Sequence, residues 1–70
     1  MQRFGAKLRT LRERRQLSQT RLGLDLGYAD GSFISQVETG KKNPTAELIL
    51  KVADYFGVST DDLLRDAREV

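Results

Sequence analysis

Cysteine and histidine are both absent from this chain of 70 residues. A domain this small buries a modest share of its surface, and disulfides or a structural metal often make up for that. Neither is available here, because no disulfide can form and the usual nitrogen and sulfur ligands of zinc are missing. We therefore expect one small domain, residues 1–70, whose stability comes from packing its own secondary structure.

Apolar residues recur every three or four positions along the chain, which is the spacing of helices with one buried face. Leu24 and Leu48 fall outside these stripes and are expected at the surface. The clearest stripe consists of Ala46, Ile49, Val52, Ala53 and Phe56. The sequence predicts a compact all-α fold of five helices and no convincing strand, with helices at about residues 2–16, 19–26, 31–39, 46–56 and 60–66.

Capping residues and glycines set the ends of the predicted helices. Ser18 and Ser59 are well placed to accept from unpaired amides at a helix start, and Asp30 is expected to cap the third helix. Gly27 ends the second helix, because glycine tolerates a positive φ. The tail after Asp66 is expected to fray.

Charge is distributed unevenly, although the net charge is only +2. Residues 1–21 carry seven basic residues and one acidic residue, whereas residues 43–70 carry three basic and six acidic residues. A basic end suggests a polyanionic partner. A solvated, arginine-rich helix face explains the same pattern, and charge alone does not separate the two interpretations.

Several classes of function receive no support from the residue types present. The longest apolar stretch, Leu48–Leu50, is far too short to span a bilayer, so we expect a cytoplasmic protein without a membrane partner. The commonest general base and the strongest nucleophile are missing with histidine and cysteine. No glycine-rich phosphate loop or calcium-binding loop is present. We therefore expect neither enzymatic activity nor a cofactor.

Two short helices joined by a glycine turn, at residues 19–26 and 31–39, carry the strongest functional signal. A helix-turn-helix needs a small residue where its two helices approach closely, and Gly23 meets that need. Gly27 can begin the turn, and Ile34 and Val37 supply the inner apolar face of the second helix.

The outer face of that second helix is polar and uncharged. On a helical wheel, the side opposite Ile34 and Val37 carries the side chains of Ser32, Ser35, Gln36 and Thr39. Phe33 and Glu38 lie on the flanks. A solvated helix would tend to carry lysine and glutamate here. Uncharged hydrogen-bonding side chains fit a surface that reads base edges in a groove of DNA.

Several segments together resemble the Xre/Cro-type helix-turn-helix family of phage and bacterial repressors. They are Leu17-Ser18-Gln19, Leu22, Leu26-Gly27, Ile34–Lys41, Asn43-Pro44-Thr45 and Gly57–Leu64. The resemblance extends from about Phe4 to Leu64. It implies a five-helix, lambda-repressor-like DNA-binding domain whose third helix is the recognition helix. It also implies a homodimer on double-stranded DNA, at a pseudo-palindromic operator.

The resemblance also suggests roles for individual side chains. Glutamine can pair with adenine, and Phe33 could press on a thymine methyl group. We expect bases to be read by Ser32, Phe33, Ser35 and Gln36. The residues that match backbone-contacting positions are Gln19, Thr39, Lys41, Lys42 and Asn43. Arg12 and Glu38 match a structural ion pair that joins the first and third helices.

The chain departs from its relatives in two places. The spacing from Gly27 to Ile34 is seven residues, one more than is usual, and this could tilt or shift the recognition helix. Arg21 stands where relatives often have glutamate. Arginine is electrostatically unfavourable in a first helical turn, so Arg21 either meets a phosphate or is plain surface.

We expect a transcriptional regulator, most simply a repressor. An antitoxin whose main partner is another protein is an alternative, although little chain remains after Leu64 to wrap a toxin. A module that bridges proteins is a third, less favoured, interpretation.

Overall fold

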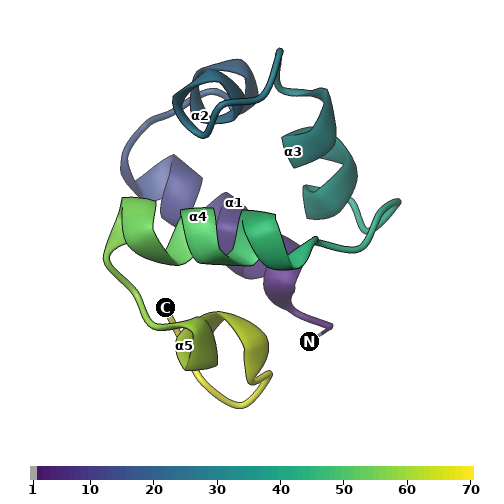
Figure 1. Ribbon diagram of the computed structural model, residues 1–70. Helices are drawn as coiled ribbons and strands as arrows, with labels where there is room; N and C mark the ends of the chain where they lie inside the picture. Colours follow the sequence, from purple (N-terminus) through teal and green to yellow (C-terminus); the bar gives the residue numbers. More distant parts are fainter. Residues whose placement is uncertain (1) are drawn as a thin grey trace.

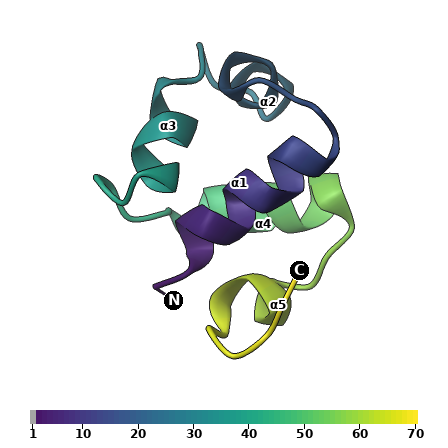
Figure 2. The same ribbon diagram turned by 180° about the vertical axis from the view of Figure 1, so that it is seen from behind.

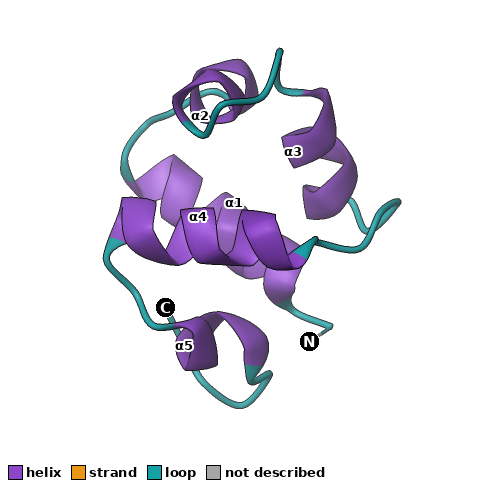
Figure 3. Cartoon of the chain, in the orientation of Figure 1, coloured by secondary structure: helices purple, strands orange, loops and turns teal. Residues whose placement is uncertain are grey.

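The computed structural model describes residues 2–70, which form five helices joined by turns and loops (Figures 1 and 3). The helices are α1 (Phe4–Arg14), α2 (Gln19–Asp25), α3 (Ser32–Glu38), α4 (Ala46–Phe56) and α5 (Thr60–Leu64). Because this part of the chain contains no strand, the predicted all-α class with five helices is confirmed. No helix within residues 2–70 is long and apolar enough to cross a membrane.

Two views from opposite sides show the same arrangement of the helices. In Figures 1 and 2, α1 and α4 cross in the middle of the molecule. The α2–α3 pair lies on one side of them, and α5 lies on the other. The helix-turn-helix pair therefore stands at one end of the molecule, away from α5.

Four of the five helices are one or two residues shorter than predicted at one end or at both, and α4 has the predicted ends. The first helix, predicted over residues 2–16, ends at Arg14. Gln16 lies outside it, in a left-handed conformation with φ of 57°. This lets the N–H of Leu17 donate to the carbonyl of Arg12 at 3.1 Å. Such a left-handed residue closes the last helical turn and lets the chain leave in a new direction.

The buried face of α4 differs from the predicted one. Leu48 is fully buried, whereas Ala46 is exposed and Ile49 is only half-buried. The prediction of a surface position for Leu48 was therefore wrong. The residues that face the core are Leu48, Val52, Ala53 and Phe56. Three consecutive apolar residues, 48–50, allow two helical stripes, and the stripe through Leu48 is the one that packs. Leu50 is left exposed, as is Leu24, which was expected at the surface.

Lys7 is buried with only 2% of its surface exposed, although no role beyond its charge was predicted for it. Its ammonium group donates to the main-chain carbonyls of Asp62 and Arg65 at 2.5 and 2.6 Å. These carbonyls lie at the end of α5, where acceptors lack partners within the helix and a cation is favourable. Lys7 thus links α1 to α5, and the chain leaves the helix after Leu64 rather than after Asp66.

The arginines of the basic N-terminal end also have partners within the molecule. Arg3 pairs with Glu69 at 2.8 Å. Arg15 donates to the carbonyl of Tyr55 at 3.1 Å, and its guanidinium lies 4.9 Å from the centre of the Phe56 ring. The basic end therefore contacts the C-terminal segment and the end of α4, which favours a structural interpretation of its charge.

The carboxylate of Asp66 closes the start of α1, although the two lie at opposite ends of the sequence. It accepts from the N–H groups of Gln2 and Arg3 at 3.2 and 3.1 Å, where α1 has no side-chain cap of its own. The hydrogen bond from the Arg3 amide lowers the pKa of Asp66. The Arg3 guanidinium likewise lowers the pKa of Glu69. The tail that was expected to fray is thus held to α1.

We expect acid to weaken this attachment. A pKa that is lower in the folded state means that the fold favours the charged carboxylate. The contribution is therefore complete above the ordinary values of 3.8 for Asp66 and 4.5 for Glu69, and it is lost as the pH falls through and below them. The urea midpoint and the exchange protection of the Arg3 amide should both fall between about pH 6 and about pH 3.

The matched variant for this test is Asp66→Asn, which does not titrate. Its single side-chain oxygen can still accept from the Arg3 amide, whereas its amino group takes the place of the oxygen that accepts from Gln2. Its midpoint should change less over the same pH range than that of the parent protein. Equal midpoints for the parent at both pH values would show that these carboxylates contribute nothing to stability.

Candidate nucleic-acid interface

Two glycines allow the main chain of the turn to lie directly on α2. A Cβ atom on Gly23 would stand 2.1 Å from the carbonyl oxygen of Asp30. One on Gly31 would stand 2.6 Å from main-chain atoms of Gln19 and Thr20. The small residue predicted at position 23 is therefore required by a close approach. The requirement at position 31 did not emerge from the sequence, where Gly31 was only part of a lengthened turn.

The lengthened turn is held from α4 as well as by its own residues. Gly27 has φ of 91°, as expected for the residue that ends α2. The ammonium group of Lys51 donates to the carbonyl of Leu26 at 2.8 Å and lies 4.8 Å from the centre of the Tyr28 ring. That ring packs at 5.4 Å from the ring of Phe33 in α3. These contacts tie the turn to α4 and α3 and so accommodate the additional residue.

The start of α3 lies one residue later than predicted. Gly31 occupies the position before the first helical residue and has no side chain to cap with. Asp30 supplies that contact from one position earlier, because its Oδ1 accepts from the N–H of Ser32 at 2.8 Å. Hydrogen bonds from Ser32 lower the pKa of the Asp30 carboxyl. Asp30 therefore bonds to the helix start as expected, but Gly31 takes the capping position.

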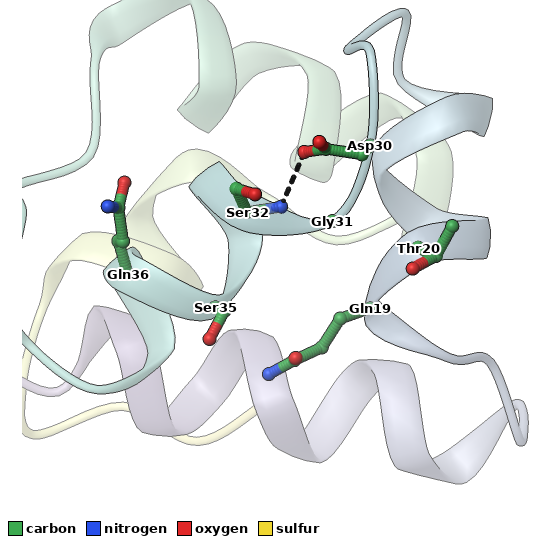
Figure 4. A pocket seen from close by; sticks show the side chains of 7 residues that line it. All are labelled: Gln19, Thr20, Asp30, Gly31, Ser32, Ser35 and Gln36. Carbon is green, nitrogen blue, oxygen red and sulfur yellow. Dashed lines mark hydrogen bonds between the residues drawn. The ribbon is translucent and has the colours of Figure 1, made fainter.

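A shallow hollow lies on the surface between α2 and α3 (Figure 4). Its lining residues are Gln19, Thr20, Asp30, Gly31, Ser32, Ser35 and Gln36. Apart from Gly31, every residue in this set has a polar side chain, and Asp30 is the one charged member. Ser32 is exposed, and Ser35 and Gln36 are half-buried. The structure thus brings three of the four predicted base-reading residues together with Gln19 from α2. This group of residues is called the polar hollow below.

Arg12 and Glu38 form a two-pronged ion pair between α1 and α3. Nε of Arg12 lies 2.8 Å from Oε2 of Glu38, and Nη2 lies 3.0 Å from Oε1. A further nitrogen of the guanidinium donates to the carbonyl of Leu17 at 2.8 Å. The side chain of Glu38 is only 3% exposed. Hydrogen bonding to Glu38 raises the pKa of the Arg12 guanidinium. The charge of Glu38 is therefore matched inside the protein and does not face the solvent.

Gln19 is connected to this ion pair. Its Nε2 donates to Oε1 of Glu38 at 3.1 Å, which fixes the amide of the first residue of α2 against the end of α3. No local pattern predicts this contact, since the two residues lie on different helices. One wall of the polar hollow is thus supported by the buried ion pair beneath it.

Three predicted contact residues lie outside the polar hollow and have partners of their own. Phe33 packs against the core and the preceding turn. Arg21 pairs with Asp25 one helical turn later, at 3.1 Å. The hydroxyl of Thr39 donates to the carbonyl of Ser35 at 2.9 Å. A DNA contact by Arg21 or Thr39 would compete with these internal bonds.

Lys41 and Lys42 follow α3 in an exposed loop, together with Asn43. The main-chain amides of both lysines donate to the carbonyl of Gln36, which fixes the loop to the end of the helix. Each of the other basic residues contacts a carboxylate or a carbonyl with its side chain within residues 2–70, and Arg65, for example, pairs with Asp61 at 3.7 Å. Lys41 and Lys42 make no such contact there, so their charges are available to an external anion.

Comparison with known proteins agrees with this arrangement. Residues 3–67 match the family model described as a helix-turn-helix domain. The cryptic phage CTXphi transcriptional repressor RstR of Vibrio cholerae is 30% identical over 64 residues, which cover 91% of this chain and 57% of that protein. An uncharacterized HTH-type transcriptional regulator of Methanocaldococcus jannaschii is 35% identical over 57 residues, which cover 81% of this chain and 85% of that protein. The chain thus spans little more than half the length of the phage repressor. With its five helices and its α2–turn–α3 unit, the chain belongs to the Xre-type helix-turn-helix family of DNA-binding domains.

Proposed function

We propose that the protein is a sequence-specific DNA-binding transcriptional regulator that places α3 in the major groove. The observation that carries this proposal is the polar hollow, where Ser32, Ser35 and Gln36 present hydrogen-bonding groups on one face. Such groups match the donors and acceptors on base edges. Lys41 and Lys42, exposed beside the end of α3, suit phosphates on the DNA backbone.

The remaining predicted contacts belong to the same proposal. Phe33 would meet a base at the flank of α3, beside the three residues of the hollow. The proposed backbone contacts are Gln19, Arg21, Thr39, Lys41, Lys42 and Asn43. Phosphate contacts supply much of the affinity for DNA, whereas base contacts supply the specificity.

We infer further that the protein acts as a repressor and binds a pseudo-palindromic operator as a homodimer. A phage transcriptional repressor among its relatives supports the first part. A single short recognition helix contacts few base pairs, and helix-turn-helix dimers gain specificity by reading two half-sites. Selection of bound fragments from a random duplex library tests binding, preference and symmetry together. We expect two inverted half-sites about ten base pairs apart. A library that emerges unenriched would contradict the proposal.

Replacing Gln36 with alanine should weaken sequence preference more than binding itself. The side chain lines the polar hollow and has no internal side-chain hydrogen bond among those of residues 2–70. We expect about a tenfold loss of affinity for the selected operator, and little change on a duplex of scrambled sequence. Fluorescence anisotropy on the two duplexes measures both quantities.

The matched control is Lys42→Gln, which removes a charge from the adjacent loop. It should weaken binding to both duplexes by a similar factor and reduce the slope of log K against log salt by about 1. An equal loss on both duplexes for Gln36→Ala would assign Gln36 to the backbone rather than to the bases.

A further inference from the structure

A carboxylate sits in the middle of a surface that is proposed to face DNA. Asp30 is exposed and lines the polar hollow, whose other side chains are uncharged. None of the ion pairs within residues 2–70 includes it. Among residues 2–70, the hydrogen-bond partner of its carboxylate is Ser32, at the start of α3.

This position is electrostatically unfavourable for a residue that only caps a helix. DNA carries a dense array of negative phosphates, so an unpaired carboxylate at the interface weakens binding to every duplex. Serine or asparagine would cap the helix about as well without the charge. The carboxylate at this position is therefore expected to accept a hydrogen bond from a donor group on the DNA.

Base edges in the major groove provide two such donors, the amino groups of cytosine and adenine. Adenine presents the N7 acceptor beside its amino group, and this acceptor would repel the second oxygen of a carboxylate. Cytosine presents its amino group without an acceptor of its own on that edge. A carboxylate therefore favours cytosine over the other three bases.

We propose that Asp30 is a specificity-determining residue that accepts a hydrogen bond from the amino group of a cytosine in the major groove. The inference rests on the proposed function, because it requires that the polar hollow face the bases. The bond from the Ser32 amide to Oδ1 orients the carboxylate. Gly31, pressed against the main chain of α2, fixes the backbone that carries it. The residue is thus held in position before any DNA arrives.

The test compares the parent protein with Asp30→Asn by selection from the same random duplex library. Asparagine has the same shape and keeps Oδ1 for the Ser32 amide, but it presents an amino group where the second carboxylate oxygen was. The parent protein should select cytosine at one position of each half-site. The variant should lose that preference and favour a base that carries acceptors there, guanine or thymine.

Affinities on fixed duplexes make the comparison quantitative. Replacing that one cytosine–guanine pair with another base pair should lower the affinity of the parent protein for the duplex about tenfold. The affinity of the variant should change little. Asp30→Asn should also bind a scrambled duplex more tightly than the parent, because a repulsive charge is gone. A second variant, Asp30→Ser, keeps a capping oxygen on a shorter side chain. It should lose the cytosine preference without gaining another.

The outcomes separate this inference from the proposed function. If the parent enriches an operator and Asp30→Asn selects the same base at every position, Asp30 only caps α3 and the inference is wrong while DNA binding stands. If Asp30→Asn changes the affinity for all duplexes by the same factor, Asp30 likewise reads no base and the inference is wrong. If the parent enriches no sequence at all, the proposed function fails and the inference with it.

Discussion

Replacing Gly23 with alanine will destabilise the protein severely. The added methyl group would lie 2.1 Å from the carbonyl oxygen of Asp30 and 2.8 Å from its carbonyl carbon. Both atoms belong to the main chain and cannot swing aside as the end of a side chain can, so α2 and the turn must separate. Overpacking of this kind costs about 1–3 kcal/mol and sometimes more, and a direct main-chain collision belongs at the upper end.

This loss of stability is large compared with the total stability of the protein. A domain of this length has about 4–10 kcal/mol of stability in total. Alanine is preferred to glycine inside a helix by about 1 kcal/mol, which offsets only part of the collision. We expect a net loss of about 2–3 kcal/mol, measured as the free energy of unfolding in urea by circular dichroism.

The control for this substitution is Gly40→Ala. A Cβ atom on Gly40 would have no neighbour within 4 Å, but the φ of 79° at this position is unfavourable for alanine. The free energy of unfolding of that variant should fall only by the cost of placing alanine in a left-handed conformation, about 1–2 kcal/mol. If Gly23→Ala were as stable as the parent protein, the main chains would not be in the close contact described above.

The positions of the helices follow from local chemistry, which is why most of them could be predicted. Thr45 accepts from the N–H of Leu48 and begins α4, and Gly57 ends it with φ of 68°. Both signals are readable in the sequence. The inward face of α4 was not readable in the same way, because residues 48–50 are all apolar and the choice among them depends on what the other helices present.

The polar hollow could be predicted in part for the same reason. Ile34 and Val37 are buried, and once they fix the inner face of α3 the helical period places Ser32, Ser35 and Gln36 on the outside. The supporting contacts could not be predicted. The bond from Gln19 to Glu38 and the burial of Lys7 depend on which distant segments meet after folding, and no spacing in the sequence records that.

The second large effect is expected for Arg12→Met, which removes the partner of a nearly inaccessible carboxylate. Glu38 is 3% exposed and would keep only the amide of Gln19 as a donor. The carbonyl of Leu17 would also lose the guanidinium. Leaving a buried charge unpaired costs about 3–5 kcal/mol, so Arg12→Met should lose a large part of the free energy of unfolding, measured in urea by circular dichroism.

The double variant Arg12→Met with Glu38→Leu distinguishes an unpaired charge from lost packing. Replacing both partners of a buried ion pair with apolar residues is often neutral for stability, since both desolvation costs disappear together. The double variant should therefore be more stable than Arg12→Met alone, a reversal that additive effects cannot produce. DNA binding should not recover in parallel, because Gln19 loses its anchor on Glu38 in the double variant. A double variant less stable than either single one would mean that Arg12 and Glu38 act through packing and not through their charges.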